Sequence, residues 1–316
     1  MKKVLPFVCP RSWPQAQQWI SALQAAMPEE QVVLLDELDL IARETCDVAI
    51  VANPDPNDLK MLPNLKWVHS VWAGVERLMT DLQDHQQLNV VRLVDPQLAA
   101  TMAEAVLAWS LYLHRDMPLY VRQQREKQWL EHEYIRAEEK VVSILGLGTL
   151  GLAAASRLQA AGFNVCGWSR TAKSVPNIQC YHGDNGLKDM LQQTDYLVCL
   201  LPLTPQTQNL VNEQVFKSLK KLASFINFGR GRIVDDHALR QALDQGYLSH
   251  AVLDVFHSEP LSSDSWHWTH QNVTVLPHIS APTNRQTASA IVAENIRKYR
   301  ADGRCTPKFV DRVTGY

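Results

Sequence analysis

The chain has 316 residues, 46% of them hydrophobic and 20% charged, with a formal net charge of −2. This composition is ordinary for a globular protein, and the length suggests about two domains. Because the net charge is near zero and no block of like charges occurs, nucleic acid and anionic membranes are not expected as main partners. No apolar run is long enough to span a membrane, and Pro6 and Pro10 interrupt the first apolar run, which argues against a secretory signal.

The cysteines and histidines show no pattern of a metal site. The six cysteines lie far apart, without a C-x-x-C pair, at positions Cys9, Cys46, Cys166, Cys180, Cys199 and Cys305. Several fall in apolar runs, which is typical of buried, reduced thiols in a cytoplasmic protein. The histidines form no H-E-x-x-H or similar motif, so we expect no metal.

The first hundred residues alternate between strand-like and helix-like patterns. Short apolar runs predict strands at 4–8, 31–35, 48–51, 65–71 and 90–94, and a helix is predicted at 13–27. Such alternation is typical of a parallel sheet covered by helices. The segment Trp72-Ala73-Gly74-Val75 directly follows the fourth strand, at the edge where open α/β sheets bind ligands.

A long connection leads to the second half of the chain. Residues 97–114 have the pattern of one largely buried helix, and residues 122–140 are rich in Arg, Gln and Glu. Trp129 and Tyr134 stand among these charged residues. Aromatic residues in such surroundings often form subunit contacts, and ordinary packing within one chain explains them equally well.

One stretch near the middle of the chain has the strongest pattern. A β-branched run at 141–145 predicts a buried strand, and Gly146, Gly148 and Gly151 follow it in the spacing G-x-G-x-x-G. Gly146 permits a tight turn, Gly148 lets the backbone approach a pyrophosphate, and Gly151 lets the helix predicted at 149–161 pack closely on the sheet. The helix N-terminus then faces the anion, so the stretch predicts a dinucleotide site.

The next strand, predicted at 164–168, ends without the Asp or Glu that usually binds the ribose hydroxyls of NAD. It ends instead in Ser169-Arg170-Thr171, with Lys173 close behind. Arg170 can bind phosphate oxygens through two parallel hydrogen bonds, and the hydroxyl side chains can add donors. The corner therefore predicts NADP, with NADPH preferred. The alternative is that Arg170 and Lys173 are solvated loop charges.

Three polar residues follow predicted strands in the second half. Strands are predicted at 196–200, 224–228, 250–255 and 273–276, with helices at 235–245 and 285–299. Arg230 stands in NFGRG, Glu259 in DVFHSEP and His278 in LPHIS. Arg230 could bind a carboxylate and polarise a carbonyl, His278 could donate a proton, and Glu259 could hydrogen-bond the other ring nitrogen of His278. Taken singly, they could equally be a surface arginine, a capping glutamate and a loop histidine.

Together these motifs carry a resemblance. GLGTLG, LPLTPQT, NFGRG, LDVFHSEP and PHIS are similar in order and spacing to the D-isomer-specific 2-hydroxyacid dehydrogenase family, from about residue 60 onward. The WSRT stretch and the terminal VDRVTGY resemble the branch that reduces glyoxylate and hydroxypyruvate. The resemblance implies an α/β fold of two doubly wound parallel-sheet domains, in which a Rossmann coenzyme domain at 97–282 is inserted into a flavodoxin-like substrate domain at 1–96 and 283–316. It also implies a homodimer formed through the coenzyme domains and an active-site cleft at the hinge.

The resemblance also assigns roles to residues. Arg230, Glu259 and His278 are the expected catalytic set. The expected coenzyme contacts are Gly146, Gly148, Thr149, Leu150, Gly151, Ser169, Arg170, Lys173, Pro202, Thr207 and Asp254. The expected substrate loop, whose amides would hold a carboxylate, is Trp72, Ala73, Gly74 and Val75. Many relatives have glycine at the position of Trp72 and aspartate at that of Glu76, so this loop could be narrowed, which leaves the exact substrate open.

The expected activity is the NADPH-dependent reduction of a short 2-oxo acid, with glyoxylate giving glycolate and hydroxypyruvate giving D-glycerate. Arg230 would hold the carboxylate and polarise the carbonyl, and His278 would supply the proton. Two alternatives remain. One is a nucleotide-sensing binding protein, because transcriptional corepressors are similar to this family. The other is an NAD-linked dehydrogenase of the phosphoglycerate type, against which the missing acidic residue at Ser169 and Arg170 argues.

Overall fold

The computed structural model describes residues 2–305 and 308–312, so the last four residues of the VDRVTGY motif lie outside the described residues. The chain divides into two compact units. Unit 1 comprises Met1–Gln97 and Thr283–Tyr316, and unit 2 comprises Leu98–Pro282. Each unit is built on a parallel β-sheet, which confirms the predicted α/β fold with two parallel-sheet domains. Within the described residues, no helix has both the length and the apolar character needed to cross a membrane.

Unit 1 contains a sheet of five parallel strands in the order β2-β1-β3-β4-β5, which is the order of flavodoxin-like sheets. The strands are β1 (Lys3–Val8), β2 (Glu30–Leu34), β3 (Val48–Val51), β4 (Trp67–Ser70) and β5 (Asn89–Val91). The central strand β3 is buried throughout, because helices cover both faces of the sheet. This burial explains why its sequence, VAIV, is an unbroken apolar run.

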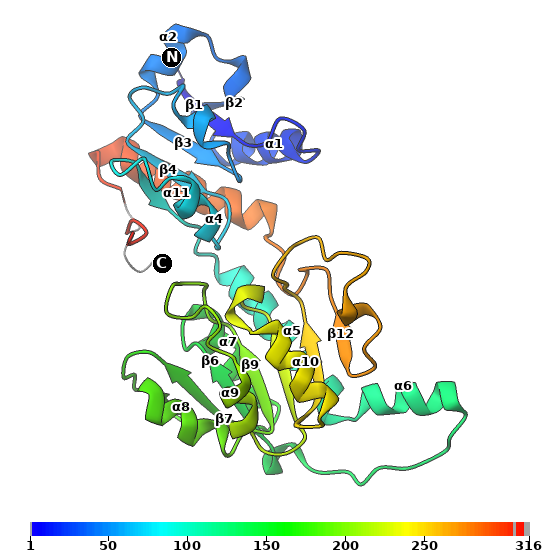
Figure 1. Cartoon of the computed structure of the whole chain (residues 1–316). Coiled ribbons are helices and arrows are strands. Elements are labelled where there is room, and N and C mark those ends of the chain that lie inside the picture. The colour runs from blue at the N-terminus through cyan, green and yellow to red at the C-terminus, as the bar shows by residue number, and fades with distance from the viewer. Residues whose placement is uncertain (1, 306–307, 313–316) are drawn as a thin grey trace. The chain divides into compact units, whose positions relative to one another are not determined.

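Helices from two distant parts of the chain cover this sheet. They are α1 (Ala16–Ala26), α2 (Leu40–Thr45), α3 (Pro56–Leu59), α4 (Glu76–Asp81) and α11 (Arg285–Asp302), with the 3₁₀ helix η1 (Leu35–Glu37). α1 and α11 pack against each other on one face, with a shared core that includes Leu23 and Val292. Figure 1 shows α11, in orange and red, among the blue and cyan elements of unit 1. The predicted final helix therefore completes the core of the N-terminal unit.

The helix predicted at 13–27 begins later than expected, at Ala16. Turns occupy the preceding residues, where the Trp13 amide donates to the Pro10 carbonyl (2.9 Å) and the Ala16 amide donates to the Trp13 carbonyl (3.2 Å). The physical reason is Pro14, because a proline disfavours helical backbone at the residue before it. The Trp13 side chain consequently leaves the helix register and packs beside Phe7.

Unit 2 contains a sheet of seven parallel strands in the order β12-β11-β10-β9-β6-β7-β8. The strands are β6 (Val141–Leu145), β7 (Asn164–Ser169), β8 (Gln179–His182), β9 (Tyr196–Cys199), β10 (Ala223–Asn227), β11 (Leu248–Leu253) and β12 (Val273–Val275). Read from β8, this is the strand order of a Rossmann sheet with one further strand. The order reverses between β6 and β9, and that switch point is where such sheets bind dinucleotides.

Helices lie on both faces of the seven-stranded sheet. They are α5 (Pro96–His114), α6 (Met117–Glu126), α7 (Thr149–Ala160), α8 (Gly183–Leu191), α9 (Glu213–Ser218) and α10 (Asp236–Asp244), with the 3₁₀ helices η2 (Ala137–Glu139), η3 (Gly231–Ile233) and η4 (Trp266–Trp268). α8, α9 and α10 contribute to the core on one face, and α5 and α7 contribute to the core on the other. This arrangement is the doubly wound pattern expected from the sequence.

α6 was not expected, and it forms part of a projecting segment. Asp116 adopts the left-handed conformation (φ 51°) and separates α6 from α5. Figure 1 shows α6 and the chain after it extending away from the sheet of unit 2 before returning to β6. Trp129, in this segment, is 93% exposed and Tyr134 is also exposed, so packing within the unit does not account for Trp129. We call residues 117–136 the arm.

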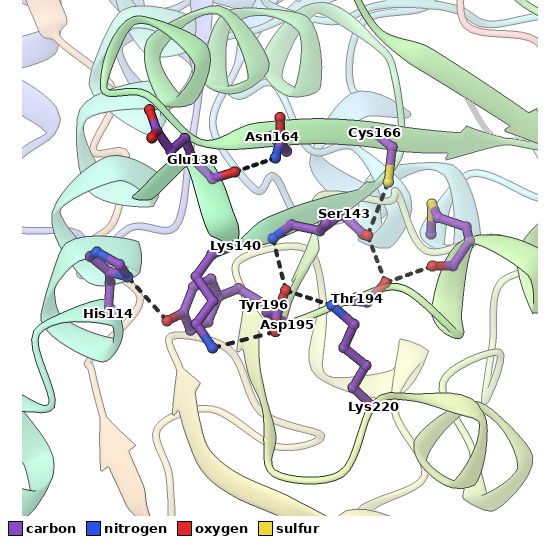
Figure 2. Close-up of polar contacts among 12 residues, drawn as sticks. His114, Glu138, Lys140, Ser143, Asn164, Cys166, Thr194, Asp195, Tyr196 and Lys220 are labelled. Carbon is purple, nitrogen blue, oxygen red and sulfur yellow. Dashed lines mark hydrogen bonds and ion pairs between the residues drawn. The ribbon is translucent and has the colours of Figure 1, made fainter. Parts of the chain in front are cut away.

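A polar cluster ties together the amino-terminal ends of the central strands of unit 2 (Figure 2). The Asp195 carboxylate, just before β9, accepts a hydrogen bond from the Val141 amide at the start of β6 (2.8 Å) and forms ion pairs with Lys220 (2.9 Å) and Lys140 (3.5 Å). The half-buried carboxylate thus has three donors from three segments. This end of the sheet is occupied by structural contacts, which leaves the opposite, carboxyl end for ligands.

Candidate active site

Most of the candidate residues of unit 2 lie at the carboxyl ends of its parallel strands. Gly146 follows β6, Ser169 ends β7, Arg230 follows β10, Asp254 follows β11 and His278 follows β12. Because parallel strands all end at the same edge of a sheet, the fold gathers residues that are far apart in sequence. In open α/β sheets this edge is the ligand-binding edge.

The glycine loop after β6 has the geometry of an anion site. Gly146 has φ of 105°, a conformation that L side chains rarely adopt. A Cβ on Gly151 would lie 1.9 Å from the Gly146 carbonyl oxygen, so only glycine lets α7 start this close to the loop. Gly148 is the N-cap residue of α7, and no side chain of the described residues caps this helix end. The first turn, with Thr149 and Leu150, therefore presents backbone amides that fit a pyrophosphate.

The corner after β7 carries positive charge beside that loop. Lys173 Nζ donates to the Leu147 carbonyl (2.7 Å), which places its ammonium group next to the glycine loop. Arg170 is exposed at the same corner. The Ser169 hydroxyl donates to the Thr171 carbonyl (2.8 Å), so its proton is used within the loop. Two cationic side chains at this corner are suited to bind the 2′-phosphate of NADP. An acidic side chain would instead suit the ribose hydroxyls of NAD.

Pro202 and Thr207 lie in a turn after β9, the strand next to β6 at the switch point. Thr207 Oγ1 donates to the Pro202 carbonyl (2.7 Å) and accepts from the Thr204 amide (2.8 Å). These contacts close the turn on itself. Both residues therefore lie beside the switch point of the sheet, and the Thr207 side chain fixes the backbone of the turn there.

Arg230 stands between two glycines that allow close backbone approach. A Cβ on Gly229 would lie 2.7 Å from the Leu201 carbonyl oxygen, and one on Gly231 would lie 2.0 Å from the Phe256 carbonyl carbon. The glycines thus pack the Arg230 loop between the segments that follow β9 and β11. The half-buried Arg230 side chain folds back so that Nη1 donates to the Gly229 carbonyl (2.8 Å).

Glu259 and His278 form the expected hydrogen bond. His278 Nδ1 lies 2.7 Å from Glu259 Oε2, and Glu259 Oε1 accepts from the Phe256 amide (2.9 Å). The carboxylate acceptor places the hydrogen on Nδ1 of His278. In the described part of the chain, Nε2 of His278 has no hydrogen-bond partner, and the side chain is 51% exposed. This nitrogen is therefore the one that a substrate oxygen can reach.

The charges of these three residues act on one another. The hydrogen bond to Glu259 raises the pKa of His278, against the opposing effects of burial and of the positive charge of Arg230. Burial favours the neutral form of Glu259, but the hydrogen bonds from His278 and the Phe256 amide outweigh it and lower its pKa. The charge of Arg230 also lowers the pKa of Glu259. The set therefore favours a protonated imidazole beside an ionised carboxylate.

Asp254 holds the backbone around His278, a contact that the sequence did not reveal. Its buried carboxylate accepts from the amides of Ile279 (2.7 Å) and Ser280 (2.9 Å), and its carbonyl accepts from the His278 amide (3.0 Å). His278 itself has φ of 53°, in the left-handed region. Both carboxylate oxygens thus accept hydrogen bonds from backbone amides, and the coenzyme contact expected of Asp254 stays a prediction.

The expected substrate loop, Trp72–Val75, belongs to unit 1 and joins β4 to α4. The Trp72 amide donates to Ser70 Oγ (3.0 Å), and its carbonyl accepts from the Leu93 amide (3.0 Å). Ala73 and Gly74 are half-buried. Within residues 2–305 and 308–312, no group of three or more His, Cys, Asp or Glu side chains is placed to hold a metal.

Known proteins resemble this chain along its whole length. Residues 107–280 match the family model described as D-isomer specific 2-hydroxyacid dehydrogenase, NAD binding domain. Glyoxylate/hydroxypyruvate reductase A of Yersinia enterocolitica is 34% identical over 96% of this chain and 97% of its own. The protein of the same name from Photorhabdus laumondii is also 34% identical, over 95% of this chain and 96% of its own.

Solved structures show the same likeness. A D-isomer specific 2-hydroxyacid dehydrogenase from Xanthobacter autotrophicus, in complex with NADPH and MES, is 38% identical, with a TM-score of 0.92 and complete coverage of both chains. The NADPH-dependent glyoxylate/hydroxypyruvate reductase from Sinorhizobium meliloti, in complex with NADP and sulfate, is 33% identical, with a TM-score of 0.89 and complete coverage of both. The chain therefore belongs to the D-isomer specific 2-hydroxyacid dehydrogenase family.

Proposed function

We propose that the protein is a reductase that uses NADPH to convert short 2-oxo acids to 2-hydroxy acids, glyoxylate to glycolate and hydroxypyruvate to D-glycerate. The observation that carries this proposal is the trio of Arg230, Glu259 and His278 at the sheet edge that also holds the glycine loop, with His278 Nε2 open to a substrate. The relatives that are named glyoxylate/hydroxypyruvate reductase A support it, as does the solved neighbour that contains NADP.

Unit 2 is, in this proposal, the coenzyme domain, and unit 1 is the substrate domain. The amides at the start of α7 bind the pyrophosphate, while Arg170 and Lys173 bind the 2′-phosphate. The Pro202–Thr207 turn borders the coenzyme at the switch point. Bound NADPH supplies the hydride that reduces the keto carbon.

The side chains of the trio have complementary roles. Arg230 offers a planar fork for the carboxylate and the keto oxygen of the substrate. The protonated His278 donates from Nε2 to the oxygen on which negative charge develops, and Glu259 stabilises the imidazolium through Nδ1. In unit 1, the amides of Ala73–Val75 bind the substrate carboxylate. These contacts raise the rate to the extent that they strengthen as the alkoxide forms.

We further infer that the protein is a cytoplasmic homodimer that associates through the arm. Exposed apolar side chains concentrate there: Met117, Leu119, Tyr120, Val121, Trp129, Leu130, Tyr134 and Ile135. This concentration of exposed apolar side chains in one segment supports an association surface, because large exposed apolar areas often mark sites of protein–protein contact. A reducing compartment agrees with the cysteines, since all six are free thiols and four are buried.

The test is a coenzyme oxidation assay. Purified protein mixed with NADPH and either glyoxylate or hydroxypyruvate should lose the absorbance of the reduced nicotinamide. The control is His278→Ala, which should bind NADPH normally and turn over about 10²–10⁴-fold more slowly. NADPH binding without turnover on a panel of 2-oxo acids would favour a nucleotide sensor instead. Faster turnover with NADH and a phosphorylated hydroxy acid would favour the phosphoglycerate type.

A further inference from the structure

Trp72 stands at the start of the proposed carboxylate-binding loop, and its ring packs on two other tryptophans. The ring meets Trp19 edge-on, with the ring centres 5.6 Å apart, and meets Trp13 edge-on at 5.9 Å. Trp13 and Trp19 stack on each other at 6.3 Å. We call these three residues the tryptophan cluster. Edge-on and stacked contacts are directional, so the cluster holds each ring in one orientation.

The cluster joins three separate elements of unit 1. Trp19 lies in α1 and is fully buried, Trp13 lies in the turns after β1, and Trp72 follows β4. Phe7 of β1 anchors the cluster to the sheet through its contact with Trp13 (6.2 Å). Because β1 and β4 both flank β3, the cluster spans the carboxyl edge of the sheet. The loop start is thereby fastened to the core of the unit.

Hydrogen bonds hold the backbone of the loop at its two ends, at Trp72 and at Val75, whose carbonyl accepts from the Met79 amide (2.8 Å). The Trp72 amide and carbonyl bond to Ser70 and Leu93, as described above. Among the described residues, none accepts a hydrogen bond from the amides of Ala73–Val75. These amides are the donors that the proposed function assigns to the substrate carboxylate. Their direction depends on the fixed residues at the two ends of the loop, which are Trp72 and the buried Val75.

We propose that Trp72 is a positioning residue for the substrate, and that the tryptophan cluster orients the Ala73–Val75 amides toward the carboxylate. The proposal rests on the proposed function. Within the described residues, the indole N–H groups of Trp72 and Trp19 have no hydrogen-bond partner, so ring packing is what orients the Trp72 side chain. Without that packing the loop samples several orientations, and substrate binding must then order it. The weaker binding of the carboxylate should raise KM and leave kcat nearly unchanged, because the carboxylate is bound alike before and during hydride transfer.

The experiment measures kcat and KM for glyoxylate, and the Kd of NADPH, in a double-mutant cycle. The variants are Trp72→Leu, Trp13→Leu and the double variant, with Trp72→Phe as the conservative replacement that keeps an edge-on ring. Trp67→Phe is the matched control, since Trp67 is a buried tryptophan of the same unit that packs on Tyr299 (5.2 Å) and outside the cluster. Melting temperatures report any general loosening of unit 1.

In Trp72→Leu we expect KM to rise about tenfold to hundredfold, with kcat and NADPH affinity within about threefold of the wild type. Trp72→Phe should restore most of the affinity. Trp13→Leu should raise KM less, and the double variant should resemble Trp72→Leu, because both changes break the same contact. Trp67→Phe should leave KM unchanged even where it lowers the melting temperature.

The outcomes separate this inference from the proposed function. A wild type that reduces neither glyoxylate nor hydroxypyruvate overturns both. An active wild type whose KM is unchanged in Trp72→Leu, or whose Trp72→Phe variant is as impaired as Trp72→Leu, overturns the positioning role alone. If Trp72→Leu does not fold, the KM of Trp13→Leu tests the positioning role instead, because this variant leaves the loop sequence intact. An unchanged KM in Trp13→Leu then overturns the inference.

Discussion

His278 occupies a conformation that a histidine rarely adopts, and its neighbours account for that. A non-glycine residue in the left-handed region costs of the order of 1–3 kcal/mol unless surrounding contacts hold it. Here Asp254 accepts three backbone hydrogen bonds from His278 and the two residues after it. Glu259 then fixes the imidazole ring through Nδ1. The direction of the proposed proton donor is therefore set by one carboxylate on its backbone and another on its side chain.

We predict that Asp254→Asn lowers kcat about tenfold to hundredfold without weakening NADPH binding. An amide side chain offers one oxygen, so either the Ile279 or the Ser280 amide loses its acceptor and the His278 loop shifts. Single-turnover kinetics and NADPH titration measure the two quantities separately. A large loss of NADPH affinity with kcat preserved would instead favour the coenzyme contact expected from the sequence.

The rate of reduction should depend on pH through His278. His278 must be protonated to donate, and its hydrogen bond to Glu259 raises its pKa above the usual value near 6.5. The kcat/KM for reduction should therefore stay high below this raised pKa and fall as the pH rises through it. In Glu259→Gln the imidazolium loses its negative partner, so the fall should move to lower pH. Rates from about pH 5 to about pH 9 test this, and an unshifted profile would remove Glu259 from the mechanism.

The third prediction concerns the coenzyme. If Arg170 and Lys173 bind the 2′-phosphate, the wild type should prefer NADPH, by roughly tenfold to hundredfold in kcat/KM for each charge-assisted contact. Arg170→Asp should reverse the preference, because it removes a phosphate ligand and adds an acceptor for ribose hydroxyls. Measurements at low ionic strength with both coenzymes are needed, since salt screens exposed charges. Equal use of NADH and NADPH by the wild type would contradict the assignment.

At the scale of elements, a buried histidine joins β4 to α11. His69 lies in β4 with its Nδ1 2.9 Å from the Ser70 carbonyl oxygen, and its Nε2 lies 2.9 Å from Nδ2 of Asn295 in α11. The Asn295 amide donates, so His69 Nε2 accepts and the ring is neutral. Complete burial lowers the pKa of His69 to about 4. Protonation would turn the acceptor into a second donor facing Asn295.

This pair gives a fourth prediction. The pKa of His69 is about 4 in the folded protein and near 6.5 when unfolded, so the unfolded chain binds more protons between these values. The free energy of unfolding of unit 1 should therefore fall as the pH drops from about 6.5 to about 4, by up to roughly 3 kcal/mol. In His69→Gln, which does not titrate, this dependence should largely disappear. Denaturant titrations along this pH range measure it, and an unchanged slope in the variant would contradict it.

The central strands were predicted from the sequence because their burial imposes an apolar pattern, whereas the short helices α8 and α9 were not predicted. β3 and β6 are buried on both faces, and their sequences are apolar, β-branched runs. β8 pairs only with β7, at the edge of the sheet, and its sequence QCYH carries no such pattern. α6 contains a proline in its first turn, has a polar second half and buries no residue, so its sequence lacks the repeating apolar pattern of a buried helix.

Some contacts of the candidate site could also be predicted from the sequence, and others could not. Glu259 and His278 could be paired from the sequence because a carboxylate is a natural partner for the second nitrogen of an acid-base histidine, and because the resemblance implies this pair. The contacts of Asp254 with the His278 loop and of Trp72 with Trp13 depend on the path of two loops in space. Local sequence patterns say nothing about such paths, because turns are set by tertiary packing. The burial of the Asp254 carboxylate, which explains its contacts with the His278 loop, can be seen only in the structure.

At the scale of the whole molecule, the arm gives the fifth prediction. Trp129→Asp combined with Tyr134→Asp should convert the proposed dimer to a monomer, because burying unpaired charges in an apolar interface is costly. Sedimentation velocity at micromolar protein measures this. Leu40→Asp is the matched control, since Leu40 is exposed but lies outside the arm, and this variant should remain a dimer. A wild type that sediments as a monomer would refute the arm as a dimer surface.

The return of α11 to unit 1 also has a consequence for synthesis on the ribosome. β1 and α1 emerge first, yet the helix that covers their face follows all of unit 2 in the chain. At about 5–20 residues per second, residues 98–282 take roughly 10 to 40 seconds to translate. During that interval unit 2 can close its own core, whereas the nascent unit 1 holds Leu23 and its neighbours open to water. The part of the chain that is made first is thus the last to be completed, and its uncovered face is where a ribosome-bound chaperone would act.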